Sequence, residues 1–245
     1  MSRLLSTVTT WILLTLLFSS SARASELLIA AAADLTPVEM AVTRGFQKSS
    51  GVPVRFTFGA SGLLLRQIEN GAPYDVYLSA NQTFVDEGIG LGALARPAVV
   101  YALGRIAVWS RSHKVARIED LDAPAIQRVA IANPEHAPYG AAAQEALENK
   151  GLWNRLKPRI VSGENVRQTL QFAETGNADA AIVSWTLVYN RGGVLIPDSL
   201  HRPIRQAGAV VKTTKRAGDA QRFLQFLQSD AGRRILQNYG LFPPR

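Results

Sequence analysis

The sequence contains no cysteine, and this absence excludes several kinds of chemistry at once. Disulfide bonds, thiol catalysis, cysteine-based metal sites and a lipid attached through cysteine are all ruled out. The three histidines, His113, His136 and His201, are scattered without the spacing of a metal site. We therefore expect no metal site built on these residue types, and burial of a hydrophobic core has to stabilise the fold.

Catalytic and nucleotide-binding motifs are also missing. The string from Gly59 to Leu63 lacks the second glycine of G-x-S-x-G, and no histidine is placed to serve Ser61 as a base. The sequence has neither a Walker A motif nor G-x-G-x-x-G. The protein is therefore predicted not to be an enzyme and to carry no cofactor.

Clustered positive charge is lacking, although the net charge is +8. The lysines and arginines are dispersed, with no block of five or more and no interleaved aromatic residues. This pattern argues against nucleic acid as a partner. Most of these side chains are expected to serve solubility, while the overall positive charge can attract anions.

No apolar run reaches the ~20 residues that a membrane-spanning helix needs. A shorter run, Trp11–Phe18, follows the basic Arg3, and Ala22-Arg23-Ala24 provides a cleavage site with small residues at its flanks. These features are typical of a secretory signal peptide. Residues 1–24 are thus predicted to be removed, leaving a mature protein that is exported to the periplasm and soluble there.

What the sequence does have is a regular alternation of strand and helix patterns. Its 245 residues, 47% hydrophobic and 19% charged, are typical of a globular protein of one or two domains. The alternation favours an α/β fold with mostly parallel sheets. Predicted strands cover residues 28–33, 52–58, 74–78, 99–109, 129–132, 159–162, 178–184, 194–196 and 209–211. Ligands of such sheets bind beyond the carboxyl ends of the strands.

The turns after the first two strands are predicted to aim helix N-termini at a ligand. The apolar run Leu28–Ala33 stops at Asp34, and Thr36-Pro37-Val38-Glu39 has the pattern of an N-cap, an N1 proline and a capping box. Ser61 is the predicted N-cap after the second strand. Free N–H groups and the helix dipole favour an anion at such places. Single strand-to-helix turns are common, so the repetition supports the anion site.

Five segments, in the same order, resemble the periplasmic molybdate-binding proteins of ABC importers. They are Ala31–Leu35, Ser61 with Leu65–Pro73, Ser79–Gln82, Asn133–Gly140 and Glu164–Arg167. The resemblance covers nearly the whole mature chain and implies a type II periplasmic binding protein fold. In that fold two α/β lobes, joined by two hinge crossings, hold an oxyanion in the cleft. Residues 25–103 and 206–245 are expected to form lobe 1, and residues 104–205 lobe 2.

The resemblance also implies which positions bind the ligand. They are Asp34, Leu35, Ser61, Gly62, Tyr139, Val166 and Ser184. Ser61 and Tyr139 would contribute hydroxyl groups, and Leu35, Gly62 and Val166 would contribute backbone N–H groups. The metal would be reached only through the molybdate oxygens, by Ser61, Tyr139 and Val166. Many family members have a tyrosine at the position of Ser184. In this chain Tyr139 would supply the phenol group in place of that tyrosine.

Asp34 departs from the family pattern, because serine is the common residue there. A carboxylate ~5 Å from a dianion costs roughly 6–7 kcal/mol at an effective dielectric constant of about 20, and a micromolar affinity is worth only about 8 kcal/mol. Three explanations stay open. Asp34 folds onto its own turn as an Asx motif and leaves the N–H groups of Leu35 and Thr36 to the ligand, its carboxyl is protonated, or the ligand brings a proton. The first is preferred.

The sequence therefore predicts a monomeric, exported binding protein that captures molybdate, and tungstate as well. Its partner would be an ABC permease in the inner membrane. A binder of phosphate or sulfate is the main alternative. An exported enzyme on the same scaffold and a receptor-like sensor module are further alternatives.

Overall fold

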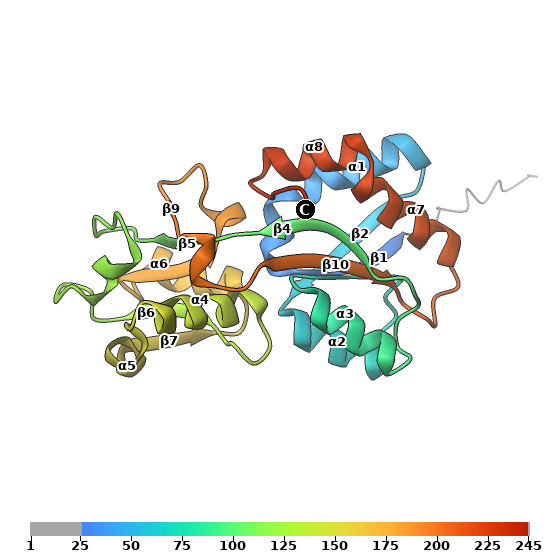
Figure 1. Ribbon diagram of the computed structural model, residues 1–245. Helices are drawn as coiled ribbons and strands as arrows, with labels where there is room; N and C mark the ends of the chain where they lie inside the picture. The colour runs from blue at the N-terminus through green and yellow to red at the C-terminus, as the bar shows by residue number, and fades with distance from the viewer. Residues whose placement is uncertain (1–25, 245) are drawn as a thin grey trace, which may run out of the picture.

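The computed structural model describes residues 26–244 and shows two five-stranded sheets flanked by helices (Figure 1). The predicted signal peptide, residues 1–24, lies outside the described residues. Within residues 26–244, no helix combines the length and the apolar character needed to cross a bilayer. We call the parts built on the first and second sheets lobe 1 and lobe 2.

The sheet of lobe 1 has the order β2-β1-β3-β10-β4. Its strands are β1 (Leu27–Ala32), β2 (Val54–Gly59), β3 (Val76–Ser79), β4 (Val99–Gly104) and β10 (Ile204–Val210). One face is covered by α1 (Glu39–Ser50), α7 (Ala217–Gln228) and α8 (Asp230–Asn238), and the other by α2 (Ser61–Glu69) and α3 (Gln82–Gly90). β1 pairs parallel with β2 and β3, whereas β10 is antiparallel to both its neighbours.

The sheet of lobe 2 has the order β7-β6-β8-β5-β9. Its strands are β5 (Ile106–Trp109), β6 (Val129–Ala132), β7 (Ile160–Gly163), β8 (Ala180–Ser184) and β9 (Val194–Leu195). Its helices are α4 (Pro138–Asn149), α5 (Trp153–Leu156) and α6 (Val166–Thr175), with 3₁₀ helices η2 (Ile118–Asp122), η3 (Lys157–Arg159), η4 (Trp185–Leu187) and η5 (Asp198–Leu200). The predicted two-lobe α/β fold class is confirmed. Both sheets are mixed, because β10 and β5 pair antiparallel with their neighbours.

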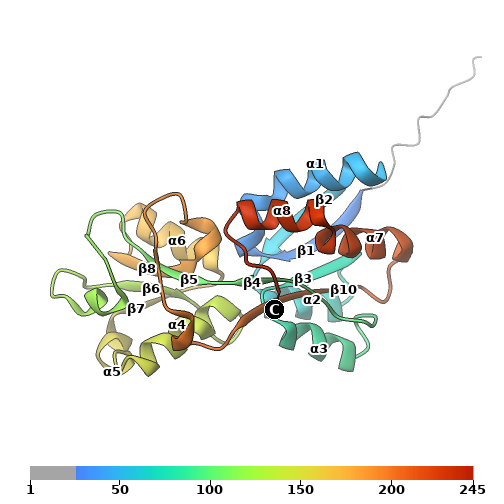
Figure 2. The same cartoon turned by 45° about the horizontal axis from the view of Figure 1, so that its top comes forward.

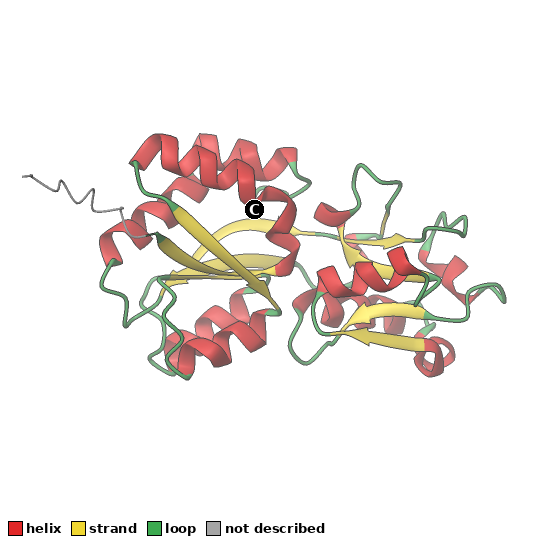
Figure 3. Cartoon of the chain, turned by 180° about the vertical axis from the view of Figure 1, so that it is seen from behind, coloured by secondary structure: helices red, strands yellow, loops and turns green. Residues whose placement is uncertain are grey.

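Two neighbouring segments connect the lobes (Figures 2 and 3). β4, at the edge of the first sheet, continues through Arg105 into β5 of the second, as the interrupted run from Val99 to Trp109 predicted. The chain returns through His201–Pro203 into β10, which pairs with β4. Both crossings therefore lie side by side.

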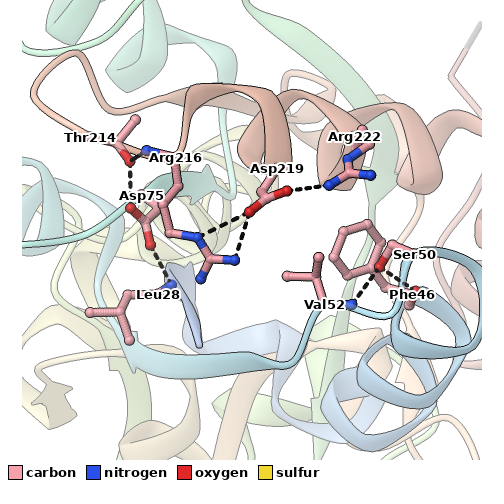
Figure 4. Close-up of polar contacts among 9 residues, drawn as sticks. All are labelled: Leu28, Phe46, Ser50, Val52, Asp75, Thr214, Arg216, Asp219 and Arg222. Atoms are coloured by element: carbon pink, nitrogen blue, oxygen red, sulfur yellow. Dashed lines mark hydrogen bonds and ion pairs between the residues drawn. The ribbon is translucent and has the colours of Figure 1, made fainter. Parts of the chain in front are cut away.

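The far end of the lobe 1 sheet is anchored by the buried carboxylate of Asp75 (Figure 4). It accepts hydrogen bonds from the N–H of Leu28 at 2.7 Å and from the hydroxyl of Thr214. The same hydroxyl accepts from the N–H of Arg216, whose guanidinium pairs with Asp219 of α7 at 2.6 Å. These contacts tie the start of β1 to the segment that leads into α7.

The start of the first helix differs from the prediction. β1 runs directly into a 3₁₀ helix, η1 (Ala33–Val38), which contains Pro37, and α1 begins only at Glu39. The hydroxyl of Thr36 donates to the carbonyl of Ala33 at 2.8 Å, so the predicted N-cap and capping box were wrong. Ser61 is likewise the first residue of α2 and not its N-cap. Both helical segments therefore begin closer to the strand ends than predicted.

Candidate functional site

Four helical segments begin around one small cavity between the lobes. η1 follows β1, α2 follows β2, α4 follows β6 and α6 follows β7. Their first residues, including Ala33, Ser61, Tyr139 and Val166, line the cavity, and none of its described lining residues is arginine or lysine. Because N–H groups are unpaired and the dipole is positive at helix N-termini, the cavity suits an anion held by neutral donors.

Backbone N–H groups and one hydroxyl are available at this cavity. Ser61, Tyr139 and Val166 occupy the first or second position of their helices, where the N–H has no partner inside the helix. The side chain of Asn165 caps the two residues after Val166, at 3.0 Å each. The hydroxyl of Ser61 accepts from the N–H of Ala80 at 3.0 Å, which leaves its own proton to donate.

Asp34 is fully buried, and its carboxylate is directed towards α4 and β10. Oδ2 accepts from the hydroxyl of Tyr139 at 3.0 Å and from the amide of Gln206, while Oδ1 has no partner among the described residues. The preferred explanation, in which Asp34 folds onto its own turn and leaves the N–H groups of Leu35 and Thr36 to the ligand, is therefore wrong. In a 3₁₀ helix such as η1, those N–H groups point to carbonyls three residues back.

The surroundings of Asp34 make it a weak acid. Burial raises its pKa to about 7, and this effect outweighs the opposing hydrogen bonds from Gln206 and Tyr139. Burial, reinforced by the charge of Asp34, also raises the pKa of Tyr139 well above its usual value. Tyr139 therefore remains a donor, and Asp34 changes charge near neutral pH.

Tyr139 lies at the predicted place but uses its hydroxyl differently. The hydroxyl donates to Asp34 and accepts from the amide of Gln206 at 2.8 Å. Its proton is therefore not available to donate to a ligand. A side chain on Gly104 would collide with this hydroxyl. The group of Tyr139 that remains for a ligand is its backbone N–H.

Three predicted residues do not line the cavity in this arrangement. Leu35 packs in the core of lobe 1, and the hydroxyl of Ser184 lies 2.8 Å from that of Thr186. The N–H of Gly62 donates to the carbonyl of His136 at 2.9 Å, and a Cβ on Gly62 would lie 3.2 Å from the Cα of His136. Gly62 thus serves the close approach of the lobes.

Gln206 and Thr186 are site residues that the sequence analysis missed. The hydroxyl of Thr186 donates to the carbonyl of Asp34 at 2.8 Å, and Gln206 is fully buried beside Tyr139. A polar residue within an otherwise apolar strand could have indicated Gln206, whereas Thr186 gave no such signal. The contacts of Asp34 with Tyr139 and Thr186 join the two lobes. In this closed arrangement the cavity measures about 10 Å³, room for about one water-sized group.

Comparison with known families decides what kind of protein has this site. Residues 27–242 match the family described as bacterial extracellular solute-binding protein. The chain belongs to this family. Among curated relatives, the molybdate-binding protein ModA of Rhodobacter capsulatus is 34% identical over 226 residues, 89% of each chain. That of Azotobacter vinelandii is 33% identical over 238 residues, 91% of this chain and 92% of the relative.

Solved structures agree with this solute-binding family. The periplasmic molybdate-binding protein of Azotobacter vinelandii superposes with a TM-score of 0.85 at 26% identity, covering 90% of this chain and 100% of that one. The sulfate-binding protein SubI of Mycobacterium tuberculosis shares the fold at a TM-score of 0.77 and 16% identity, covering 89% of this chain and 87% of that one. The resemblance stated from the sequence is confirmed. The family is one of binding proteins, which confirms the prediction that the chain is not an enzyme.

Proposed function

We propose that the protein captures molybdate in the interlobe cavity and delivers it to the permease of an ABC importer in the inner membrane. The observation that carries this proposal is the convergence of η1, α2, α4 and α6 on one cavity whose described lining contains no lysine or arginine. Oriented N–H groups can hold a compact anion without a counter-charge. The two relatives named as molybdate-binding, at 34% and 33% identity, support the choice of oxyanion.

The donors proposed to hold the ligand are uncharged. They are the hydroxyl of Ser61 and the N–H groups of Ser61, Tyr139 and Val166. Hydrogen bonds from such groups to an oxyanion are charge-assisted and directional. A smaller sulfate would leave some donors unsatisfied, which gives selectivity by size. Tungstate has the same charge and shape, so we propose that it binds too, with either metal reached only through its oxygens.

Delivery requires the lobes to open and close. The cavity of about 10 Å³ has room for only one water-sized group, so a tetrahedral oxyanion needs the lobes farther apart than in this arrangement. The contacts of Asp34 with Tyr139 and Thr186, and of Gly62 with His136, would form on closure. We propose lobes of residues 25–103 with 206–245 and of residues 104–205. We propose that the mature protein acts as a monomer in the periplasm, where the closed lobes present a joint surface to the permease.

Calorimetric titration of the purified mature protein tests the proposal. Molybdate and tungstate should bind with micromolar or tighter affinity, and sulfate and phosphate at least about tenfold more weakly. Ser61→Ala should weaken molybdate binding, whereas Ser49→Ala, on an exposed position of α1, should not. Absence of heat with both metal oxyanions would refute the assignment.

Hydrogen phosphate is the second candidate ligand, on one observation. Oδ1 of Asp34 is a buried acceptor without a partner among the described residues, and a ligand that carries a proton could satisfy it. In the same titration, phosphate would then bind more tightly than molybdate. That order of affinities would favour this candidate.

A further inference from the structure

A second cavity, of about 340 Å³, lies at the two hinge crossings. Its wall combines the first crossing around Arg105, the second crossing from His201 to Arg205, and Phe242 near the C-terminus. Phe242 is held there by two backbone hydrogen bonds with Leu103, at 2.7 and 2.9 Å. Figure 2 shows the C-terminal segment beside the crossing strands. The volume falls within the range of small-molecule sites, ~300–1,000 Å³.

The hinge cavity is separate from the anion site but adjoins it through one residue. The two cavities share no lining residue. Gly104 lines the hinge cavity, and the hydroxyl of Tyr139 rests where a side chain of Gly104 would lie. Tyr139 in turn contacts Asp34 of lobe 1. An occupant of the hinge cavity therefore touches the same backbone that supports the anion site.

The lining combines an apolar body with excess positive charge. Leu103, Pro203, Ile204, Phe242 and Pro243 provide the apolar surface. Among the described lining residues, the guanidinium groups of Arg105 and Arg205 lie there with the carboxylate of Asp198. This composition favours an anionic ligand that also carries apolar surface.

Arg105 is the group best placed to hold such an anion. Its guanidinium lies over the ring of Phe242, 5.6 Å from the centroid, and its side chain is only 21% exposed. The carboxylate of Asp198 is 3.5 Å away and 61% exposed, so this pair is weak. Nη2 of Arg105 donates to the carbonyl of Ile196 at 3.2 Å, whereas Nε is buried and has no partner among the described residues. A half-compensated guanidinium of this kind can gain a stronger partner.

We propose that the hinge cavity binds a small organic carboxylate with an aromatic or branched apolar body. The carboxylate would take the place of Asp198 beside Arg105 and form a paired hydrogen bond with the guanidinium. The body would pack between Phe242 and Ile204, removing apolar surface from water. This ligand differs from the anion of the interlobe cavity in needing an apolar part.

Occupancy of the hinge cavity is coupled to closure of the lobes. The ligand contacts both crossings and Phe242 of lobe 1, and therefore favours the closed arrangement that gives the cavity this shape. Because linkage is reciprocal, the carboxylate raises the affinity for the anion by the same factor as the anion raises the affinity for the carboxylate. Typical coupling factors are roughly 5–150.

Titration of the mature protein with benzoate, with its interlobe site first saturated with molybdate, tests this proposal. Benzoate should bind with a millimolar or tighter dissociation constant, detected by ligand-observed NMR. Benzyl alcohol keeps the ring without the charge, and inorganic phosphate keeps the charge without the ring. Both should bind the hinge cavity at least about tenfold more weakly. Failure of benzoate to bind would overturn the proposal.

Variants locate the site. Arg105→Gln and, independently, Phe242→Ala should each weaken benzoate binding at least about tenfold. Arg55→Gln is the matched control, because this exposed arginine pairs with Glu26 on lobe 1 away from the hinge. Unchanged binding in both hinge variants, or mutual displacement of benzoate and molybdate, would contradict the assignment. Anion affinity with and without benzoate then measures the coupling, and equal affinities would refute it.

Discussion

The hydroxyl of Tyr139, on α4 of lobe 2, donates to the carboxylate of Asp34, on η1 of lobe 1, at a distance of 3.0 Å. This bond joins the lobes directly beside the anion cavity, and Gln206 donates to both partners. The carboxylate, which would repel an anion if ionised, is thereby directed towards two hydrogen-bond donors. It is also buried without a cationic partner among residues 26–244, so its protonation state depends on the closed arrangement.

The stability of the folded protein should depend on pH through Asp34. Burial raises the pKa of this acid from 3.8 to about 7, so the folded state binds a proton that the unfolded state releases between those values. Its contribution to stability is therefore greatest at low pH and is lost as the pH rises towards 7. The loss is on the order of 4 kcal/mol at most.

Comparison of wild type with Asp34→Asn isolates this effect. The asparagine cannot ionise. The unfolding free energy of the variant should therefore increase relative to that of the wild type as the pH rises from about 4 to about 7. Urea unfolding across this range measures the difference. Two parallel stability curves would show that Asp34 does not titrate in the folded protein as described.

Anion affinity should fall with rising pH for the same reason. An ionised Asp34 repels a dianion, so the binding-competent form is the neutral acid, whose pKa is about 7 in the free closed site. Molybdate should bind roughly tenfold more weakly at pH 8 than at pH 6. Calorimetry on Asp34→Ser should give a flat profile; a pH-independent affinity in the wild type would contradict the prediction.

The fold could be predicted from the sequence because its strands are marked locally. The buried strand Val129–Ala132 was predicted with its observed bounds, and the crossing between β4 and β5 was visible as an apolar run interrupted at Gly104-Arg105. The 3₁₀ helix η1 was not predicted, because the pattern around Thr36 is that of an α-helix start. Its packing against η4 of the other lobe is a tertiary contact that local propensity does not contain.

The positions of the site residues were more predictable than their roles. Asp34, Ser61, Tyr139 and Val166 line the cavity, and their contact with a ligand stays a prediction. The partners of the Asp34 carboxylate lie 105 and 172 residues along the chain, so only the assembled fold brings them together. A sequence pattern can place a side chain at a strand end, but it cannot say which distant donor that side chain meets.

Tyr139→Phe should weaken anion binding without abolishing it. The variant loses the donor to Asp34 and the acceptor for Gln206, but it keeps the backbone N–H of α4. Loss of a buried hydrogen bond costs about 1–3 kcal/mol. It also removes a bond that lowers the pKa of Asp34, so the midpoint of the pH dependence should move upwards. Calorimetry at several pH values measures both effects, and an unmoved midpoint would speak against the contact.

Gly104→Ala should lower both the stability of the protein and its affinity for the anion, although Gly104 does not line the anion cavity. A Cβ at this position would collide with the hydroxyl of Tyr139 and lie 3.0 Å from Cγ2 of Ile204, so Tyr139 has to move away from Asp34. Overpacking of this kind costs about 1–3 kcal/mol of stability, and anion affinity should fall with it. Gly218→Ala, in α7, is the matched control, because the added carbon would meet nothing within 4 Å apart from its chain neighbours and the backbone of its own helix; it should stabilise the helix by roughly 0.5–1 kcal/mol. Thermal unfolding and molybdate titration of both variants test the contrast. If the two variants had the same stability and the same molybdate affinity, the position of the Tyr139 hydroxyl would not depend on the absence of a side chain at Gly104.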